Sequence, residues 1–474
     1  MKNKVRTAIV LFVSCFIISS CEDFLDREPT SEVSNEELLS DLDGINFALA
    51  GVYSRLINSD YYYLKGMQMY TALRSGNVKL NNSFSGIATT NMLPVYEFNT
   101  LPSDSSPIIG SYQSLYQLIT YANNIIEAIP NLADGDQTLK NQYLGEALTL
   151  RALAHFDLTR LYAQPYSYTQ NGTHLGIVTL PENIGVFELP SRSPLYEAYR
   201  LIISDLEQAE SLLGGYRSGR VTKAFISKGV AQALLARVYL YKKDWNNAIT
   251  YASKVISNQD YQLVNHDNYL AAWAATTTNQ EDIFVLETSE NGAPKLAAQF
   301  GQIGTQTTVG ILTKDLLEIY DDGDIRAELI EEKKEGAYVT RKFHYDASYG
   351  DRYFPIIRLA EMYLIRAESS AEIGDNIQAR ADLGIIQQRA NPDASPVTLS
   401  GDALKDAILL ERRKELALEG HYYFDLIRRG KDIVRTDCNA SMNCTVSTPS
   451  DLQILPIPQK NININDNLEQ NQGY

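Results

Sequence analysis

The stretch at residues 408–430, ILLERRKELALEGHYYFDLIRRG, holds the densest set of side chains that could do chemistry. Glutamates can transfer protons and arginines can bind anions, so these residues could form an active site. Their three- and four-residue spacing also places them along one helix, which Gly420 is expected to end, so they could instead form an ion network. The sequence favours the network, whose expected members are Glu411, Arg412, Arg413, Glu415 and Glu419, with Asp425 joined to Arg428 or Arg429.

The sequence lacks the common catalytic and cofactor motifs. There is no HExxH pair, no cysteine-rich cluster, no GxGxxG or GxxxxGK[ST] loop and no GxSxG elbow. The spacing of the histidines does not indicate a zinc site, and His155 is expected to be a hydrogen-bonded core residue. Asp321-Asp322-Gly323-Asp324 could hold calcium, but the EF-hand spacing is missing and a helix-ending turn is favoured. No catalytic residue, metal or cofactor is predicted, although the many carboxylates leave a glycosidase pair open.

Aromatic side chains are the more informative group, because the chain has 30 tyrosines and 2 tryptophans. Flat rings flanked by Asn, Gln and Arg suit sugars, since a ring stacks on C–H groups while polar side chains bond the hydroxyls. Trp245 lies in a helical segment, where packing explains it, whereas Trp273 lies in a loop-rich stretch. Tyrosine is also an ordinary core residue, so this pattern alone is a weak indication.

Length and composition are those of a folded protein, with 474 residues, of which 44% are hydrophobic and 21% are charged. The formal net charge of -16 repels phosphate backbones. The charge therefore argues against nucleic-acid binding.

The N-terminus is expected to be a targeting segment, at residues 1–20. Basic residues precede an apolar run at 8–18, which is too short to span a bilayer. The run leads to Ser19-Ser20-Cys21, which resembles a bacterial lipobox, so cleavage before Cys21 and acylation of this cysteine are predicted. An ordinary signal peptide with a structural Cys21 is the alternative.

The four cysteines fit this interpretation. Cys15 leaves with the signal and Cys21 takes lipid, which leaves Cys438 and Cys444 in the short polar stretch CNASMNC. In an oxidising compartment these two could close a small disulfide loop, and two free thiols are the alternative.

Helical spacing of apolar residues predicts that most of the chain is α-helical. Two stretches, 236–248 and 367–379, repeat one another, with paired alanines and a turn aspartate (Asp244 and Asp375). Each indicates a helix, a tight turn and a second helix, which is the tetratricopeptide-type hairpin. A long helical bundle without repeats is the alternative. Pairs around 114–162 and 195–257, and a tail pair at 356–390 and 402–419, indicate several such hairpins.

Other segments do not follow this pattern. Residues 35–56 are predicted to be one helix, whereas 57–113 is rich in Tyr, Asn, Ser and Gly and is predicted to be mainly loop. Within 258–350, short strands are expected at 282–287 and 337–345. The proline-containing end of the chain is expected to be an extended tail that lies on the body.

Together these segments resemble the SusD/RagB family of outer-membrane lipoproteins. The resemblance covers nearly all of the chain after the signal, in the family's order. The sequence departs from the family pattern at His155, Tyr422, Asp466 and Gln472. The matching motifs are CEDFLD at 21–26, GEALTLRALAHFDLTRLYAQPY at 145–166, RSPLYEAYRLIISDLEQAESLL at 192–213, ALLARVYLYKKDWNNAI at 233–249, RLAEMYLIRAESSAEIGD at 358–375, ERRKELALEGHYYFDLIRRG at 411–430 and the tail LPIP…NLEQNQGY.

The resemblance implies a mostly α-helical fold, with about four tetratricopeptide-like helix pairs on one side. The other side would be an irregular, loop-rich ligand-binding half with a few short strands. An N-terminal region at 21–215 and a C-terminal region at 216–474 are implied.

The resemblance also implies a non-enzymatic, surface-exposed lipoprotein of the outer membrane that binds nutrients. It would be the lid of a SusC-like TonB-dependent transporter, with its helical repeats facing the transporter. The ligand is expected to be an oligosaccharide, with a peptide or another nutrient as the alternative. A surface glycoside hydrolase is the alternative function.

Ligand sites of this family are built from segments outside the repeats, which correspond here to about 60–100 and 265–345. The rings would stack on sugar faces, and Arg74 and Asn77 would bond hydroxyl groups. Taken singly, each of these side chains is better explained by a structural role than by a ligand contact, so the prediction concerns the group. The candidate residues are Tyr62, Tyr70, Arg74, Asn77, Tyr96, Tyr269 and Trp273.

Overall fold

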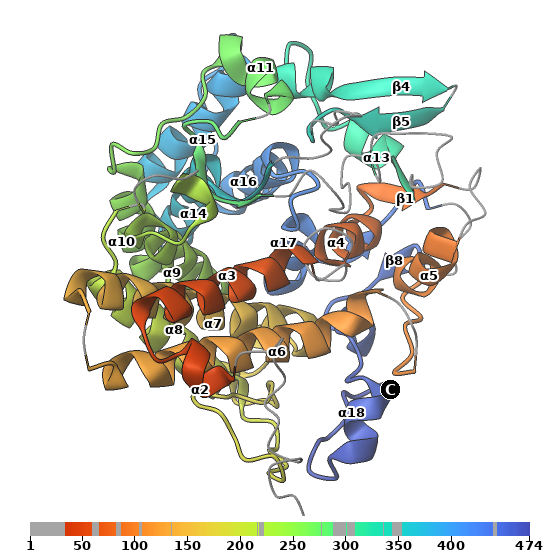
Figure 1. The fold of residues 1–474 in the computed structure, drawn as a ribbon. Coiled ribbons are helices and arrows are strands. Elements are labelled where there is room, and N and C mark those ends of the chain that lie inside the picture. The colour runs from red at the N-terminus through yellow and green to blue at the C-terminus, as the bar shows by residue number, and fades with distance from the viewer. Residues whose placement is uncertain are drawn as a thin grey trace, which may run out of the picture.

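An array of helices that follow one another in the chain forms one half of the molecule (Figure 1). Neighbouring helices of the array pack side by side from α6 to α10, and α10 then packs against α14. The helices are α6 (Pro107–Ala128), α7 (Gln137–Tyr162), α8 (Leu195–Leu212), α9 (Lys228–Lys242), α10 (Trp245–Ile256), α14 (Leu359–Glu372), α15 (Asn376–Ala390) and α16 (Gly401–Glu415). The computed structural model describes residues 34–58, 66–81, 87–103, 107–133, 135–215, 217, 222–275, 277–287, 300, 309–334, 336–343, 353–438 and 443–474.

The two repeated stretches form the expected helix–turn–helix units, α9–α10 and α14–α15. Asp244 and Asp375 begin the second helix of each unit, because their carboxylates accept a backbone N–H of its first turn, at 3.4 and 3.1 Å. The turn contains a left-handed residue, which is Lys243 at φ 61° in one unit and Gly374 at φ 87° in the other. The paired alanines of both units are fully buried, so the two helices approach closely.

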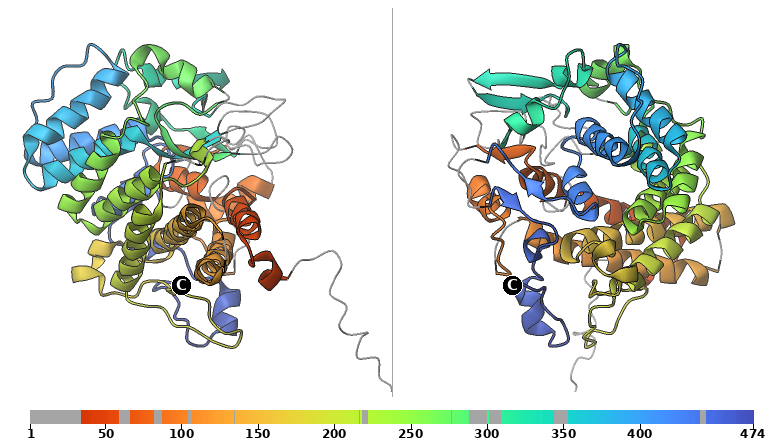
Figure 2. Two further views of the ribbon diagram at one scale, coloured as in Figure 1. Left: turned by 60° about the vertical axis from the view of Figure 1, so that its left-hand side comes forward. Right: turned by 180° about the vertical axis from the view of Figure 1, so that it is seen from behind.

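The other half of the molecule is irregular and carries most of the strands, as the two views in Figure 2 show. One antiparallel sheet has the order β1-β3-β5-β4, and two smaller sheets pair β2 with β6 and β7 with β8. The strand predicted at 282–287 is confirmed. Of the strand predicted at 337–345, residues 337–340 form a strand, 341–343 do not, and 344–345 lie outside the described residues. The strands are β1 (Val78–Leu80), β2 (Asp282–Glu287), β3 (Gly310–Leu312), β4 (Ile330–Lys334), β5 (Ala337–Thr340), β6 (Tyr353–Arg358), β7 (Ile433–Val434) and β8 (Thr445–Val446).

The expectation of a mostly helical chain with a few short strands is confirmed. The largest hydrophobic cluster of the described residues extends from Ile45 to Leu468, so side chains from both halves of the sequence contribute to it. Within the described residues, no helix combines the length and the apolar character needed to cross a bilayer. Shorter helices complete the fold: α11 (Tyr269–Ala274), α13 (Lys314–Leu317), α17 (Tyr422–Arg428), α18 (Gln459–Ile464) and the 3-10 helix at Ile325–Leu329.

Two predictions for the N-terminal part were wrong. The single helix expected at 35–56 is split into α2 (Asn35–Leu38) and α3 (Leu42–Asn58), because the Asp41 carboxylate accepts the Gly44 N–H at 2.8 Å and starts a new helix. The segment expected to be mainly loop contains α4 (Gln68–Ser75) and α5 (Ile87–Tyr96). Every residue of α4 is buried, so its sequence lacks the apolar-and-polar period by which a surface helix is predicted.

The C-terminal tail lies on the body of the protein, as expected. The Leu455 N–H bonds to the Leu161 carbonyl at 2.8 Å, and the Asn471 amide bonds to the Tyr162 carbonyl at 2.9 Å. The tail also contains the short helix α18, which the sequence did not indicate.

The charged stretch at 408–430 forms a buried ion network, but most of its partners come from other segments. The Glu415 carboxylate is fully buried and lies 2.7 Å from Arg389, 3.0 Å from Arg358 and 3.1 Å from Arg326. Glu419 pairs with Arg358 at 2.8 Å. Burial alone would raise the pKa of Glu415, but the facing cations hold it far below its usual range. The expectation that these charges pair along their own helix was therefore wrong.

A second part of the network follows the expected pattern. Arg428 lies 2.7 Å from Asp425, which also accepts from Arg412 at 2.9 Å. The helix that was expected to continue to Gly420 ends instead at Glu415. At this end of the helix, the Glu415 carbonyl accepts hydrogen bonds from the side chains of Lys342 and Arg358, at 2.8 and 3.1 Å.

Stability should fall on acidification where Glu368 titrates. Burial would raise the pKa of this carboxyl, but Arg428, at 2.5 and 2.6 Å, together with Arg429 and Arg412, lowers it to about 2. Because the folded pKa lies below the ordinary value of 4.5, this stabilisation is complete above that pH and is lost as the pH falls towards 2. Its size is on the order of 3 kcal/mol.

Glu368→Gln should therefore cost roughly 3 kcal/mol at pH 7 and little near pH 2, as measured by urea unfolding at a series of pH values. Wild type and variant must be compared at each pH, because burial raises the pKa of Asp282 to about 6. The stability that this carboxyl contributes therefore changes with pH in the opposite direction to that of Glu368. If the difference in free energy of unfolding between wild type and variant stays constant from pH 7 to pH 2, the prediction is wrong.

Candidate ligand-binding site

The two segments expected to build the ligand site meet in one sheet. β1 comes from the segment at 60–100, and β3, β4 and β5 come from the segment at 265–345. In the antiparallel register, Val78 faces Leu312 and Leu80 faces Gly310. A Cβ atom on Gly310 would lie 2.3 Å from a Val78 methyl group, so glycine permits this close approach. The fold therefore brings the two segments side by side.

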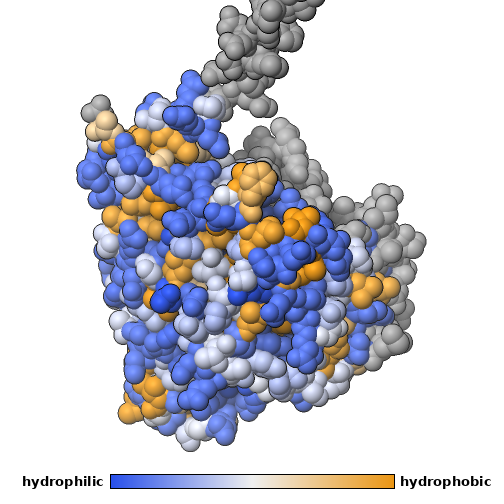
Figure 3. Space-filling view, turned by 90° about the horizontal axis from the view of Figure 1, so that it is seen from below, coloured by the Kyte–Doolittle hydropathy of each residue, from blue (hydrophilic) through white to orange (hydrophobic). Residues whose placement is uncertain are grey.

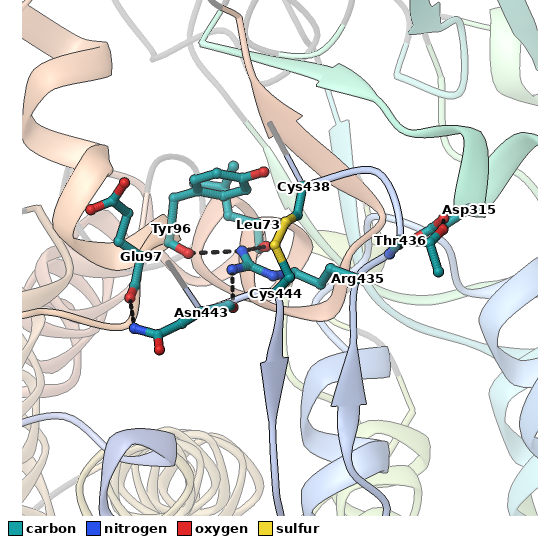
Figure 4. Close-up of a disulfide and its surroundings, with 9 residues drawn as sticks. All are labelled: Leu73, Tyr96, Glu97, Asp315, Arg435, Thr436, Cys438, Asn443 and Cys444. Atoms are coloured by element: carbon teal, nitrogen blue, oxygen red, sulfur yellow. Dashed lines mark hydrogen bonds between the residues drawn. A yellow bond between two sulfur atoms is a disulfide. The ribbon is translucent and has the colours of Figure 1, made fainter. Parts of the chain in front are cut away.

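A disulfide loop adds a third segment to this region (Figure 4). Cys438 and Cys444 form a disulfide, with their Cα atoms 5.8 Å apart. Just before the loop, Arg435 donates to the Tyr96 carbonyl at 2.7 Å, and its guanidinium lies 4.5 Å from the centre of the Tyr96 ring. The base of the loop is thereby bonded to the end of α5.

The same loop base is tied to the sheet. The Lys79 ammonium of β1 lies 2.7 Å from the Asp437 carboxylate, which also accepts the backbone N–H of Lys314 at 3.0 Å. The Thr436 N–H donates to Asp315 of α13 at 2.8 Å. Burial would raise the pKa of Asp437, but its bonds to Lys79 and Lys314 lower it, so the carboxylate is charged at neutral pH.

Among the described candidate residues, Trp273 keeps part of its surface exposed. The centre of its ring lies 4.9 Å from the Lys342 ammonium and 5.1 Å from the Arg358 guanidinium, and the ring of Phe343 meets it edge-on at 6.3 Å. Both cations also pair with Glu419, at 2.6 and 2.8 Å. Side chains of the ion network therefore contact the Trp273 ring and fix its orientation.

The other described candidates are buried. Arg74 donates to the Leu452 carbonyl at 2.7 Å and to the Val95 carbonyl at 3.2 Å, and its guanidinium lies 4.8 Å from the centre of the Tyr70 ring. The Tyr70 ring in turn meets the ring of Tyr423 edge-on, at 5.3 Å. These contacts join α4 to α5, to α17 and to the 3-10 helix at Asp451–Gln453, which is a structural role.

The remaining candidates have similar positions. The side chain of Asn77 accepts from Arg413 at 2.9 Å, and the Tyr269 ring lies 4.6 Å from the Arg389 guanidinium. A side chain without exposed surface cannot stack on a ligand or bond it in this structure. The expected ligand contacts therefore do not fit the positions of Tyr70, Arg74, Asn77, Tyr96 and Tyr269, and Tyr62 lies outside the described residues.

Sequence reasoning missed the residues that hold this region together. The sequence places Lys342 and Phe343 in an expected strand and Arg358 in a helical repeat motif, and it indicates no role for Arg435. Their importance depends on partners far away in the chain, such as Glu419 for Lys342, and no local pattern indicates such a pairing.

Two carboxylates of the turn at 321–324 are engaged in ion pairs. In the turn at 321–324, Asp324 pairs with Arg326 at 2.7 Å and Asp321 pairs with Lys414 at 2.5 Å. Within the described part of the chain, no group of three or more His, Cys, Asp or Glu side chains could hold a metal ion. The described residues of this region include one partly exposed aromatic ring, that of Trp273, beside the cations Lys342 and Arg358.

Comparison with known proteins agrees with this architecture. A family model described as "SusD family" matches residues 326–474, and a second, described as "Starch-binding associating with outer membrane", matches residues 23–240. The crystal structure of a protein from Bacteroides vulgatus, described as sugar binding, has 30% sequence identity to this chain and a TM-score of 0.79. The match covers 91% of this chain and 98% of that chain. The chain belongs to the SusD/RagB family.

Two further SusD relatives complete the comparison. A SusD superfamily protein from Bacteroides vulgatus has a TM-score of 0.83 at 29% identity, with 91% of this chain and 99% of that chain covered. The starch-binding protein SusD of Bacteroides thetaiotaomicron is 36% identical over 132 residues, which are 27% of this chain and 23% of that protein.

One departure from the SusD/RagB pattern has a clear structural role here. His155 is fully buried in α7, its Nε2 accepts the Leu180 N–H at 3.2 Å, and its Nδ1 lies 3.1 Å from the Arg151 carbonyl. Burial first, and then the nearby Arg151, lower the pKa of His155 to about 3. The ring is therefore neutral, and it bonds the connection between α7 and α8 to the helical array.

Proposed function

We propose that this protein is a cell-surface nutrient-binding lipoprotein that binds an oligosaccharide and serves as the lid of a SusC-like TonB-dependent transporter. The match to a model described as starch-binding and associating with the outer membrane supports a carbohydrate ligand and this location. The lipobox-like Ser19-Ser20-Cys21 supports a lipid anchor at Cys21. The lid role and the transporter partner rest on membership of the family.

The observation that carries the proposed binding function is the position of Trp273. Its ring is partly exposed in the irregular half, and Lys342 and Arg358 hold it in place. A pyranose can stack on such a ring at low entropic cost, because the ring is already oriented before the sugar arrives. Peptides or other nutrients would use the same surface, and the ligand panel below separates these classes.

Trp273→Ala should raise the dissociation constant for the bound glycan at least about tenfold, which corresponds to roughly 1.4 kcal/mol of lost stacking. Isothermal titration calorimetry with a panel of oligosaccharides and peptides measures the change. Trp245→Ala is the matched control, because Trp245 is also partly buried but lies in α10 of the helical array. The glycan affinity of Trp245→Ala should equal that of the wild type.

Two results would overturn the proposal. If the wild type binds no oligosaccharide of the panel, the carbohydrate ligand is wrong. If product chromatography after prolonged incubation finds released sugar, the protein is a surface glycoside hydrolase instead. Equal affinity of Trp273→Ala and wild type would remove Trp273 from the site and leave glycan binding itself in place.

A further inference from the structure

The connection between α7 and α8 and the tail helix α18 expose a group of apolar side chains. Val186 and Phe187 are 94% and 96% exposed, although a folded protein normally shields such residues. Ile464 of α18 is 72% exposed. The full group, called the apolar tip below, is Ile184, Val186, Phe187, Leu189 and Ile464.

Hydrogen bonds hold the apolar tip in a fixed shape. The Glu188 N–H bonds to the Gly185 carbonyl at 2.9 Å and closes a turn that has Val186 and Phe187 at its outer corner. Asn465 and Asn467, on either side of Asp466 after α18, donate to the carbonyls of Pro190 and Leu189, at 2.9 and 2.8 Å.

The other end of the turn is bonded to the helical array. The Asn183 N–H donates to the Glu127 carboxylate at 3.0 Å, and the Asn183 amide donates to Asn124 at 2.6 Å. Both partners belong to α6. A preformed apolar projection of this kind loses little conformational entropy when it enters a complementary surface.

The apolar tip lies at the end of the molecule where the described chain begins. α18, the connection between α7 and α8, and α2 all lie at the lower end in Figures 1 and 2. Twelve residues separate Cys21 from Ser34, and a chain of that length spans at most about 40 Å. If Cys21 is acylated as proposed, this end of the molecule stays close to the outer membrane.

The charges around the apolar tip distinguish a protein partner from the lipid surface. Exposed carboxylates flank it at Glu127, Glu182, Glu188 and Asp466, and the lysine of α18, Lys460, is bonded to Gln113 at 2.5 Å. Segments that insert into anionic lipid surfaces carry lysine and arginine beside their apolar residues, which is the opposite pattern. Figure 3 shows this end, with apolar patches set in a mainly hydrophilic surface.

We infer that the apolar tip docks into an apolar socket with a basic rim on the extracellular face of the transporter, and so fixes the lid to its barrel. The inference rests on the proposed lid function. Aromatic and aliphatic anchors that enter a partner's pocket carry a large share of the binding energy at protein interfaces, and a complementary charged rim sets their orientation.

The test uses the full-length protein in its own outer membrane. Phe187 is replaced by the photo-crosslinking residue p-benzoylphenylalanine, intact cells are irradiated, and the products are identified by mass spectrometry. The same replacement at Ile377, which is 78% exposed on α15, is the matched control. We expect Phe187 to crosslink to a TonB-dependent barrel and Ile377 to give much less of that product.

A double variant, Val186→Asp with Phe187→Asp, supplies an independent measurement. The amount of barrel that copurifies with it from gentle detergent extracts should fall at least about tenfold relative to wild type, while Ile377→Asp copurifies normally. A melting temperature equal to that of wild type shows that the double variant is folded. Glycan binding by the double variant should be unchanged.

The outcomes separate the two proposals. If wild type copurifies with the barrel but the double variant does so equally, or if Phe187 crosslinks only to lipid or lipopolysaccharide, the docking role of the apolar tip is wrong and the lid function stands. If the wild type itself brings down no barrel, the lid function fails and the docking inference fails with it.

Discussion

Glu415→Ala should lower the free energy of unfolding by about 3–5 kcal/mol, because it leaves buried cations without their partner. The carboxylate is fully buried and lies within 3.1 Å of Arg326, Arg358 and Arg389. Those arginines come from three different segments, so the substitution loosens contacts between parts of the chain that are far apart. Urea unfolding monitored by circular dichroism gives the change in free energy.

Glu331→Ala is the control for this prediction. Glu331 pairs with Lys333 at 2.7 Å on the exposed strand β4, and such a surface pair is worth less than about 1 kcal/mol. Glycan affinity of Glu415→Ala, measured where the variant is folded, should stay close to that of wild type. If instead Glu415→Ala melts like wild type but no longer binds, the charged stretch is a functional site and the structural interpretation is wrong.

Arg74→Ala should cost roughly 2–5 kcal/mol of stability, since it removes a large buried side chain and leaves carbonyl groups without a donor. The guanidinium is fully buried, it bonds to the carbonyls of Val95 and Leu452, and its other neighbours include the rings of Tyr70 and Phe98 at 4.8 and 4.4 Å. The guanidinium also donates to the Tyr423 hydroxyl at 3.2 Å, so aromatic faces and neutral oxygen acceptors surround the charge. Thermal unfolding measures the loss.

This substitution also decides between the two roles considered for Arg74. A structural role predicts a lower melting temperature with unchanged glycan affinity in the folded fraction. Arg55→Ala is the matched control, because Arg55 is partly exposed and lies 3.2 Å from the Tyr121 hydroxyl, so its loss should cost less than about 1 kcal/mol. A stable Arg74→Ala variant with weakened glycan binding would return Arg74 to the ligand site.

The helical array could be predicted from the sequence because the signals that determine it are local. The alanine spacing, the turn and the capping aspartates Asp244 and Asp375 all lie within one helix–turn–helix unit. The two strands that lie in the predicted places, β2 and β5, are similarly short runs of β-branched and aromatic residues.

The irregular half could be predicted only in outline. The two segments predicted to lie together do meet, where β1 pairs with β3. The helix α4 was not predicted, because a helix that is buried on every side shows no alternation of apolar and polar residues. Tyr70 and Arg74 belong to this buried helix, and no local sequence pattern indicates that both side chains are buried.

The difference between Tyr70 and Trp273 shows what composition cannot decide. Both are aromatic residues in segments outside the repeats, and only the packing of distant segments around them buries one and leaves the other partly exposed. The prediction of the partners of Glu415 was wrong for the same reason, because Arg326, Arg358 and Arg389 come from outside its helix.

The pairing of β1 with β3 has a consequence for the order in which this protein folds. The Thr313 hydroxyl bonds to the Gly76 carbonyl across 237 positions of sequence, and Arg74 bonds to the Tyr423 hydroxyl across 349. Contacts of this range close very large loops and form slowly, whereas the hairpins α9–α10 and α14–α15 need only neighbouring residues. The helical array can therefore form early, while the half that carries Trp273 is completed only after nearly the whole chain is present.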